Sequence, residues 1–319
     1  EFRRVLFRSA YLKLNPKGVV PTLVHEGHAI VESSLICEYI DETFPAPALF
    51  PPTPYLRTRM RLWSKLIDEQ IFEATRELSF SAHFRYKMQT MTEAQRQVRY
   101  ANVGDPERRA RFMSTYELGV ESPYVFQSIG HWEKAFKAMD EALAENGTWL
   151  VGDAFTLGDV NMIPYVARLD YLELLDVFID DRPRVRDWWK KAFARPSAVS
   201  AIPARLEKAE IDEMREFGSK IRADVATKRA QFIERHPALC AQQHADGCAL
   251  ALPIEQCAFA TVDGAGVAPA RRPGSTADVV IAAPGSHAAS RSRAACMNCA
   301  TVAVQPKKVR TFQSVASSR

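Results

Sequence analysis

Residues 15–23 (NPKGVVPTL), followed by Glu32 and Ser33, carry the groups needed to bind a small peptide-like anion. A cis bond between Val20 and Pro21 would turn the backbone groups of Val20 outward at the start of a strand. Exposed N–H and C=O groups at such a place pair with a peptide ligand as an added strand would. Ser33 lies where a helix is expected to begin, and helix N-termini favour carboxylates. The carboxylate of Glu32 would complement an ammonium group.

The charges of this pattern narrow the ligand further. A γ-glutamyl group carries both a carboxylate and an ammonium, and glutathione is the common cellular molecule that offers them. Each half of the pattern also has a plainer interpretation, because Val-Pro pairs are frequent in turns and Glu-Ser pairs are frequent helix caps. The two halves together, at this spacing, favour a glutathione site over two unrelated turns.

A hairpin and a helix must position these residues. Residues 19–24 are rich in β-forming side chains, Gly27 supplies a tight turn, and residues 29–31 form the returning strand. The apolar spacing then predicts a helix over residues 33–43. Five prolines within residues 45–54 predict a stiff, extended linker.

The chain after this linker is predicted to be helical. Apolar residues recur at helical spacing over residues 56–78 and again over residues 125–143, which is typical of an antiparallel bundle. Ser122 is a predicted N-cap for the second of these helices. Thr156 and Asp159 have the spacing of a capping box, so we interpret Asp159 as structural rather than catalytic.

These motifs resemble those of the cytosolic glutathione transferases. The resemblance covers about residues 10–209 and rests on residues 15–23, on Glu32 with Ser33, and on the TLGD capping box at residues 156–159. It implies a thioredoxin-like N-terminal domain, a helical C-terminal domain, a homodimer, and glutathione bound as co-substrate between the two domains.

The resemblance also assigns roles to four residues. Val20 is expected to hold the cysteinyl backbone of glutathione, with Pro21 as the cis proline. Glu32 and Ser33 are expected to hold the γ-glutamyl end. The family residue that activates the thiol is a Ser, Tyr or Cys in an opening strand–helix–strand unit. Ser9 and Tyr11 precede the loop too closely to be that residue, so no catalytic residue is assigned.

Residues 31–42 and 57–69 are similar to the bacterial β-etherase branch of the family, whose enzymes use glutathione to cleave β-aryl ethers of lignin-like compounds. The predicted function is therefore to bind glutathione and to conjugate it to, or use it to cleave, an electrophilic aromatic small molecule such as a β-aryl ether. Two alternatives stay open: a non-catalytic binding or regulatory module of the same fold, and an inactive, truncated sequence.

The predicted fold class is α+β. A thioredoxin-like domain reduced to β-β-α precedes an all-α bundle and a disordered tail. The chain is expected to begin with a non-native-looking leader at residues 1–9 and the partial thioredoxin-like domain at 10–44. The linker at 45–54 and the helical domain at 55–217 follow. Residues 218–319 are expected to contain the end of the last helix and then a disordered or out-of-frame tail.

Composition places the chain among globular proteins. Of its 319 residues, 47% are apolar and 25% are charged. The chain carries 42 Lys and Arg residues and 38 Asp and Glu residues. Eight of the basic and four of the acidic residues lie from Ala238 onward, so the residues before Ala238 hold 34 basic and 34 acidic side chains. A neutral body argues against a nucleic-acid surface, and no apolar run has the length of a membrane span.

Cysteine usage indicates a cytoplasmic protein. Cys37 is the one cysteine before the tail, which fits a reducing compartment without a disulfide framework. Cys296 and Cys299 form a CxxC pair in the tail, but no second ligand pair accompanies it. The sequence therefore predicts no metal site.

Overall fold

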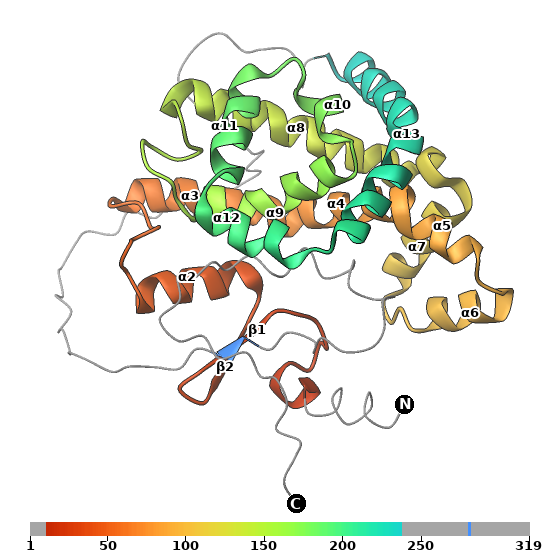
Figure 1. Cartoon of the computed structure of the whole chain (residues 1–319), viewed down its shortest axis with the longest axis horizontal. Coiled ribbons are helices and arrows are strands. Elements are labelled where there is room, and N and C mark those ends of the chain that lie inside the picture. The colour runs from red at the N-terminus through yellow and green to blue at the C-terminus, as the bar shows by residue number, and fades with distance from the viewer. Residues whose placement is uncertain (1–10, 238–279, 282–319) are drawn as a thin grey trace, which may run out of the picture. The chain divides into compact units, whose positions relative to one another are not determined.

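The computed structural model describes residues 11–237 and 280–281. The chain divides into two compact units (Figure 1). The hairpin unit comprises the described residues 11–31 and 280–281, and the helical unit comprises residues 32–237. The leader predicted at residues 1–9 lies outside the described residues, and the predicted domain boundaries stay predictions.

The hairpin unit is built on strands β1 (Thr22–His25) and β2 (His28–Val31). They pair antiparallel with Thr22 opposite Val31. Gly27 lies in the turn between them at a φ of 81°, which confirms the predicted hairpin and the reason for a glycine at its tip.

A third, short strand completes the sheet. Strand β3 (Val280–Ile281) pairs antiparallel with β1 and gives the order β2-β1-β3. This pairing falls inside the segment predicted to be disordered or out of frame. The remainder of that segment from residue 238 onward, including Cys296 and Cys299, lies outside the described residues.

The helical unit contains α-helices joined by short turns. Its α-helices are α2 (Ser33–Thr43), α3 (Pro54–Leu66), α4 (Phe72–Ser79), α5 (Arg85–Gln89), α6 (Glu93–Ala101), α7 (Pro106–Leu118), α8 (Pro123–Asn146), α9 (Leu157–Tyr171), α10 (Leu175–Ile179), α11 (Pro183–Phe193), α12 (Pro196–Ala201) and α13 (Lys208–Arg235). Two π-helical turns, η1 (Ile67–Ile71) and η2 (Phe80–Phe84), and two 3₁₀ turns, η3 (Gly119–Glu121) and η4 (Pro203–Arg205), complete it.

The two predicted apolar stripes form the centre of the bundle. Trp63 on α3 and Trp132 and Phe136 on α8 are fully buried. Helix α4 packs against α8, α3 packs against α9, and α13 packs against α8 (Figure 1). The bundle prediction is confirmed, because each stripe faces another helix rather than solvent.

Local capping sets where the main helices begin. The hydroxyl of Thr156 and the carboxylate of Asp159 form the predicted capping box at the start of α9. Ser122 occupies the N-cap position of α8, but its hydroxyl makes no capping bond. Instead it lies 3.0 Å from the hydroxyl of Ser114 and accepts a longer bond from Thr115 at 3.4 Å. Ser122 is therefore the N-cap residue of α8, as predicted, but its side chain bonds Ser114 instead of the first turn of α8.

Candidate functional site

The loop before β1 is organised by a buried asparagine. Asn15 is 1% exposed and accepts two hydrogen bonds from the residues that follow it. Its side-chain Oδ1 accepts from the amide of Lys17, and its backbone oxygen accepts from the amide of Gly18. Gly18 lies at a φ of 63°, where a side chain would be strained. The Asn-Pro-Lys-Gly order thus forms a tight loop.

The Val20–Pro21 peptide bond is cis, as predicted. It directly precedes Thr22, the first residue of β1, and Thr22 lies opposite Val31, the last residue of β2. Glu32 is the next residue along the chain after Val31. The hairpin register therefore explains why the two halves of the predicted site are separated by ten residues.

The residues that begin α2 have an unusual backbone. Glu32 is the N-cap residue of α2 and lies at a φ of 69°, a region that non-glycine residues seldom occupy. Its side chain makes no capping bond, and the first turn of α2, which starts at Ser33, contains no acidic residue. Residues held in such conformations cluster at binding sites, which makes Glu32 a better candidate than an ordinary cap.

Asp68 on η1 lies close to the start of α2 and was not identified from the sequence. Its carboxylate accepts a hydrogen bond of 2.9 Å from the hydroxyl of Ser34. Burial raises the pKa of Asp68 above its usual value; the Ser34 bond opposes this rise, and the negative charges of Glu32 and Glu69 add to it. This concentration of negative charge favours a positively charged ligand group. Because Ser34 and Asp68 are 34 residues apart, no local pattern pointed to their contact.

Tyr11 is the residue nearest the loop that offers a titratable hydroxyl. Its O–H donates to the carbonyl of Val19 at 2.5 Å, and its oxygen lies 2.9 Å from the hydroxyl of Thr22. A tyrosine has one proton to donate. In the described structure that proton is engaged with the Val19 carbonyl rather than being directed at a ligand. Ser9 lies outside the described residues.

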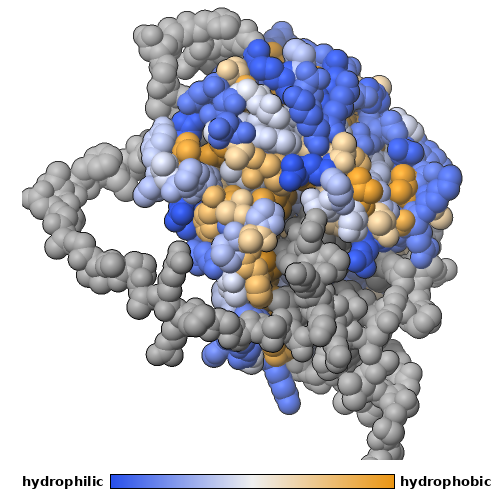
Figure 2. Space-filling view, turned by 60° about the vertical axis from the view of Figure 1, so that its left-hand side comes forward, coloured by the Kyte–Doolittle hydropathy of each residue, from blue (hydrophilic) through white to orange (hydrophobic). Residues whose placement is uncertain are grey.

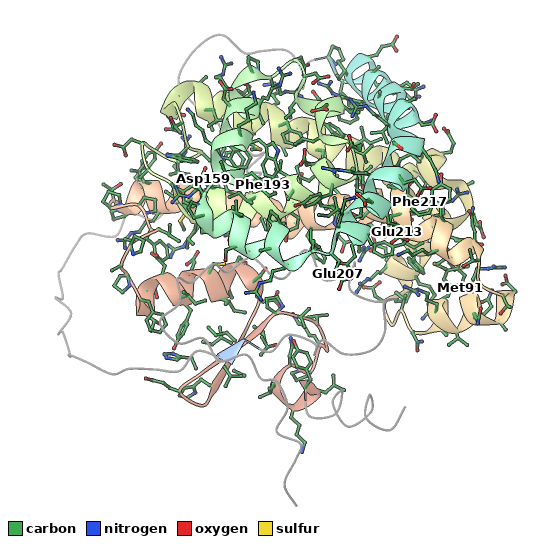
Figure 3. The ribbon with its side chains drawn as sticks, viewed as in Figure 1. Met91, Asp159, Phe193, Glu207, Glu213 and Phe217 are labelled. Atoms are coloured by element: carbon green, nitrogen blue, oxygen red, sulfur yellow. The ribbon has the colours of Figure 1, made fainter. Side chains whose placement is uncertain are left out.

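The aromatic residues of η2 and α5 divide into buried and half-buried ones. Phe80 is buried and packs against Phe112 with ring centroids 4.4 Å apart. Phe84 packs on the same cluster. Tyr86 stacks instead on Phe217 of α13 at 5.1 Å, and both of these rings are half-buried (Figure 3 labels Phe217). Phe80 is therefore a core residue, whereas Tyr86 and Phe217 form a half-buried pair under the ammonium of Lys220.

A buried histidine lies beside this aromatic pair. His83 on η2 is 1% exposed, and its Nε2 lies 3.3 Å from the carboxylate of Glu213 on α13. Burial lowers the pKa of His83, the charge of Lys87 lowers it further, and Glu213 opposes both effects. Lys87 itself pairs with Glu213 at 2.8 Å (Figure 3 labels Glu213). The described residues contain no group of three or more His, Cys, Asp or Glu arranged to hold a metal ion.

Two family models match the chain. The model described as the glutathione S-transferase N-terminal domain matches residues 3–48, and that described as the C-terminal domain matches residues 106–190. Maleylacetoacetate isomerase of Pseudomonas aeruginosa is 30% identical over 198 residues, which cover 61% of this chain and 76% of that protein. The chain belongs to the glutathione S-transferase family, whose co-substrate is glutathione.

A second bacterial relative is similar to this chain in both sequence and fold. Protein LigF of Sphingobium sp. is 30% identical over 158 residues, which cover 47% of this chain and 59% of LigF. The crystal structure of the β-etherase LigF superposes with a TM-score of 0.51 at 24% identity, covering 60% of this chain and 80% of that one. The fold is therefore the thioredoxin-like and helical arrangement of this family. The chain spans 59% of LigF and 76% of the isomerase.

Proposed function

We propose that this protein is a glutathione-dependent transferase. The loop at Val20 and Pro21 would bind the cysteinyl backbone of glutathione, and Glu32 and Ser33 would bind its γ-glutamyl end. The observation that carries the proposal is the hairpin register, in which Thr22, next to Pro21, lies opposite Val31, next to Glu32. Membership of the glutathione S-transferase family supports the same ligand.

The two charged groups of the γ-glutamyl end of glutathione complement the polar groups at the start of α2. Its carboxylate would accept from the hydroxyl and the backbone amide of Ser33, at the positive end of the helix dipole. Its ammonium would lie near the carboxylates of Glu32 and Asp68, whose mutual repulsion a cation relieves. Asp68 thus extends the set of four residues predicted from the sequence.

The reaction would be nucleophilic substitution by the glutathione thiolate. The sulfur forms a bond to an electrophilic carbon, and the leaving group departs with the electron pair of the broken bond. For a β-aryl ether, the Cβ–O bond breaks, and the phenolate that leaves takes up the proton that the thiol released. A hydrogen bond to the sulfur would lower the thiol pKa. No described residue is assigned to that step.

We propose an aromatic ether as the electrophile, because the chain is similar to the β-etherase LigF. The similarity to a maleylacetoacetate isomerase supports a second candidate, glutathione-dependent isomerisation of a small unsaturated acid. Parallel assays with a β-aryl ether, with maleylacetoacetate and with a general aromatic electrophile would separate the two. Glutathione binding without turnover of any of the three would favour the non-catalytic module.

Titration calorimetry of the full chain with glutathione tests the binding assignment. Ser33→Ala and Glu32→Gln should each weaken binding roughly tenfold, because each removes a bond to a charged group of the ligand. Ser200→Ala, in an exposed part of α12, is the matched control and should bind as the unchanged protein does. Equal affinity of Ser33→Ala and Ser200→Ala would refute the assignment.

We further propose a cytoplasmic homodimer. Helices α2, α3 and α4 expose the large apolar side chains of Leu35, Tyr55 and Phe72. One face of the molecule shows a patch of apolar residues within a mostly hydrophilic surface (Figure 2). Among the described residues, no helix is both long and apolar enough to cross a membrane. Light scattering after size exclusion should give twice the mass of one chain, and a monomer would contradict the dimer.

A further inference from the structure

Three polar side chains form a closed hydrogen-bond network around the Val19 carbonyl. That carbonyl accepts from the Tyr11 hydroxyl at 2.5 Å and from the Asn15 side-chain amide at 2.7 Å. The same amide also donates to the Thr22 hydroxyl at 3.3 Å. Because the Tyr11 proton is used on Val19, the Thr22 hydroxyl must be the donor in the 2.9 Å contact between Thr22 and Tyr11.

This network is buried at its centre. Asn15 is 1% exposed and Thr22 is 0% exposed. A buried network whose members are all paired rigidifies the segment that it holds. Leaving one of its buried donors unpaired costs more than the bond itself contributes. The network therefore holds the Val19 carbonyl in one orientation.

The orientation of this carbonyl determines that of the next amide. The carbonyl of Val19 and the N–H of Val20 belong to one planar peptide unit, in which the two groups point in opposite directions. Two donors on the Val19 oxygen therefore direct the Val20 N–H away from Tyr11 and Asn15. Val20 is the residue whose backbone would bind the cysteinyl part of glutathione.

We propose that Tyr11 and Asn15 are positioning residues for glutathione, which set the direction of the Val20 N–H by holding the Val19 carbonyl. This inference rests on the proposed glutathione site. It assigns the hydroxyl of Tyr11 to substrate binding through the backbone, and not to activation of the thiol. It also gives a reason for an asparagine at position 15, because only the amide supplies two donors together with the oxygen that Lys17 uses.

The first experiment compares two tyrosine variants of the full chain by titration calorimetry with glutathione. Tyr11→Phe keeps the ring and removes the hydroxyl, and we expect the Kd to rise about tenfold. Tyr55→Phe is the matched control, because Tyr55 is 66% exposed on α3. In turnover assays, Tyr11→Phe should raise the KM for glutathione while kcat and the KM of the electrophile stay unchanged.

Thr22 provides a rescue pair. Thr22→Ser keeps the hydroxyl and should bind glutathione within about twofold of the unchanged protein, whereas Thr22→Val removes it and should resemble Tyr11→Phe. Asn15→Asp keeps the oxygen but loses both donors. It should weaken binding most, since the new carboxylate would face the Val19 oxygen.

Trypsin cleavage after Lys17, followed by mass spectrometry, reports on the loop without glutathione. Lys17 is exposed, and cleavage there should accelerate several-fold in Tyr11→Phe and stay unchanged in Tyr55→Phe. If the unchanged protein binds glutathione and Tyr11→Phe binds equally well, the positioning role is refuted while the proposed function stands. If the unchanged protein does not bind glutathione, both are refuted.

Discussion

In the hairpin unit, polar side chains close together in the sequence fix the geometry, whereas in the helical unit apolar side chains and buried charges far apart in the sequence do so. Tyr11, Asn15 and Thr22 lie within twelve residues. Tyr11 and Asn15 donate to the Val19 carbonyl, and the Thr22 hydroxyl bonds both of these side chains. In the helical unit, Glu133 of α8 is 2% exposed and pairs with Arg182, before α11, and with Arg229 of α13. Hydrogen bonds between residues close in sequence therefore fix the loop before β1, whereas contacts between distant residues fix the bundle.

The largest effect is expected at Asp159, which ties three segments of the bundle together. Its carboxylate accepts from the amides of Leu150 and Thr156 at 3.0 Å each and from the Trp188 indole at 2.8 Å. Asp159→Ala leaves these buried donors unpaired, and we expect the free energy of unfolding to fall by about 4 kcal/mol. Urea unfolding followed by circular dichroism measures it.

Asp153→Ala is the control for Asp159, because Asp153 is an exposed acid of the same loop. It should change stability by less than about 0.5 kcal/mol. A similar loss in both variants would contradict the view that Asp159 acts through its buried bonds. The fraction of Asp159→Ala that stays folded should bind glutathione normally, because the hydrogen bonds of Asp159 go to Leu150, Thr156 and Trp188 and not to the proposed site.

The second effect tests how closely α13 packs. A Cβ added to Gly218 would lie 1.9 Å from the backbone oxygen of Leu172, so the helix must shift to accept it. Gly218→Ala should lower the free energy of unfolding by about 2 kcal/mol. Gly104→Ala, where an added Cβ meets nothing within 4 Å, should be nearly neutral. If Gly218→Ala were equally neutral in urea unfolding, the described packing of α13 would be wrong.

The smallest expected effect is a pH dependence of the stability of the helical unit. Because burial lowers the pKa of His83 in the folded protein, the unfolded chain takes up a proton there first as the pH falls. The stability that neutral His83 permits is complete above its ordinary pKa of about 6.5 and is lost progressively below it. Lys87 and Arg168 face this imidazole as positive charges and Glu213 as a negative one.

His83→Gln should therefore flatten the fall in Tm between pH 7 and pH 5. His28→Gln, in the exposed part of the hairpin, is the control and should leave the fall unchanged. Differential scanning calorimetry at four or five pH values measures both. Parallel curves for His83→Gln and the unchanged protein would show that the acid loss arises elsewhere.

Most of the fold was predictable because its signals are local. The turn at Gly27, the cis bond at Pro21, helix α2 and the capping box of Thr156 and Asp159 each depend on residues within a few positions of one another. The two apolar stripes equally allowed their helices to be predicted, since burial on one face repeats with the helical period. The same locality explains why residues 15–23 could be predicted to form a tight loop with a cis peptide bond.

What was missed depends on contacts between distant residues. Asp68 lies against Ser34 through a π-helical turn that no residue pattern announced. The hydroxyl of Ser122 bonds Ser114 of α7 rather than its own helix. The spacing of Tyr11 excludes it as the thiol-activating residue, but spacing alone does not predict that its hydroxyl bonds the Val19 carbonyl. Sequence spacing showed that these polar groups exist, but tertiary packing decided which partner each one found.

The most direct test of the account is an amide NMR titration of the full chain with glutathione. Selective ¹⁵N labelling of valine and serine reports on Val20 and Ser33 at once. We predict that these two amides show the largest chemical-shift changes and saturate together, because one ligand bonds both. Shifts confined to residues of the helical unit beyond α2, with Val20 and Ser33 unmoved, would contradict the proposed site.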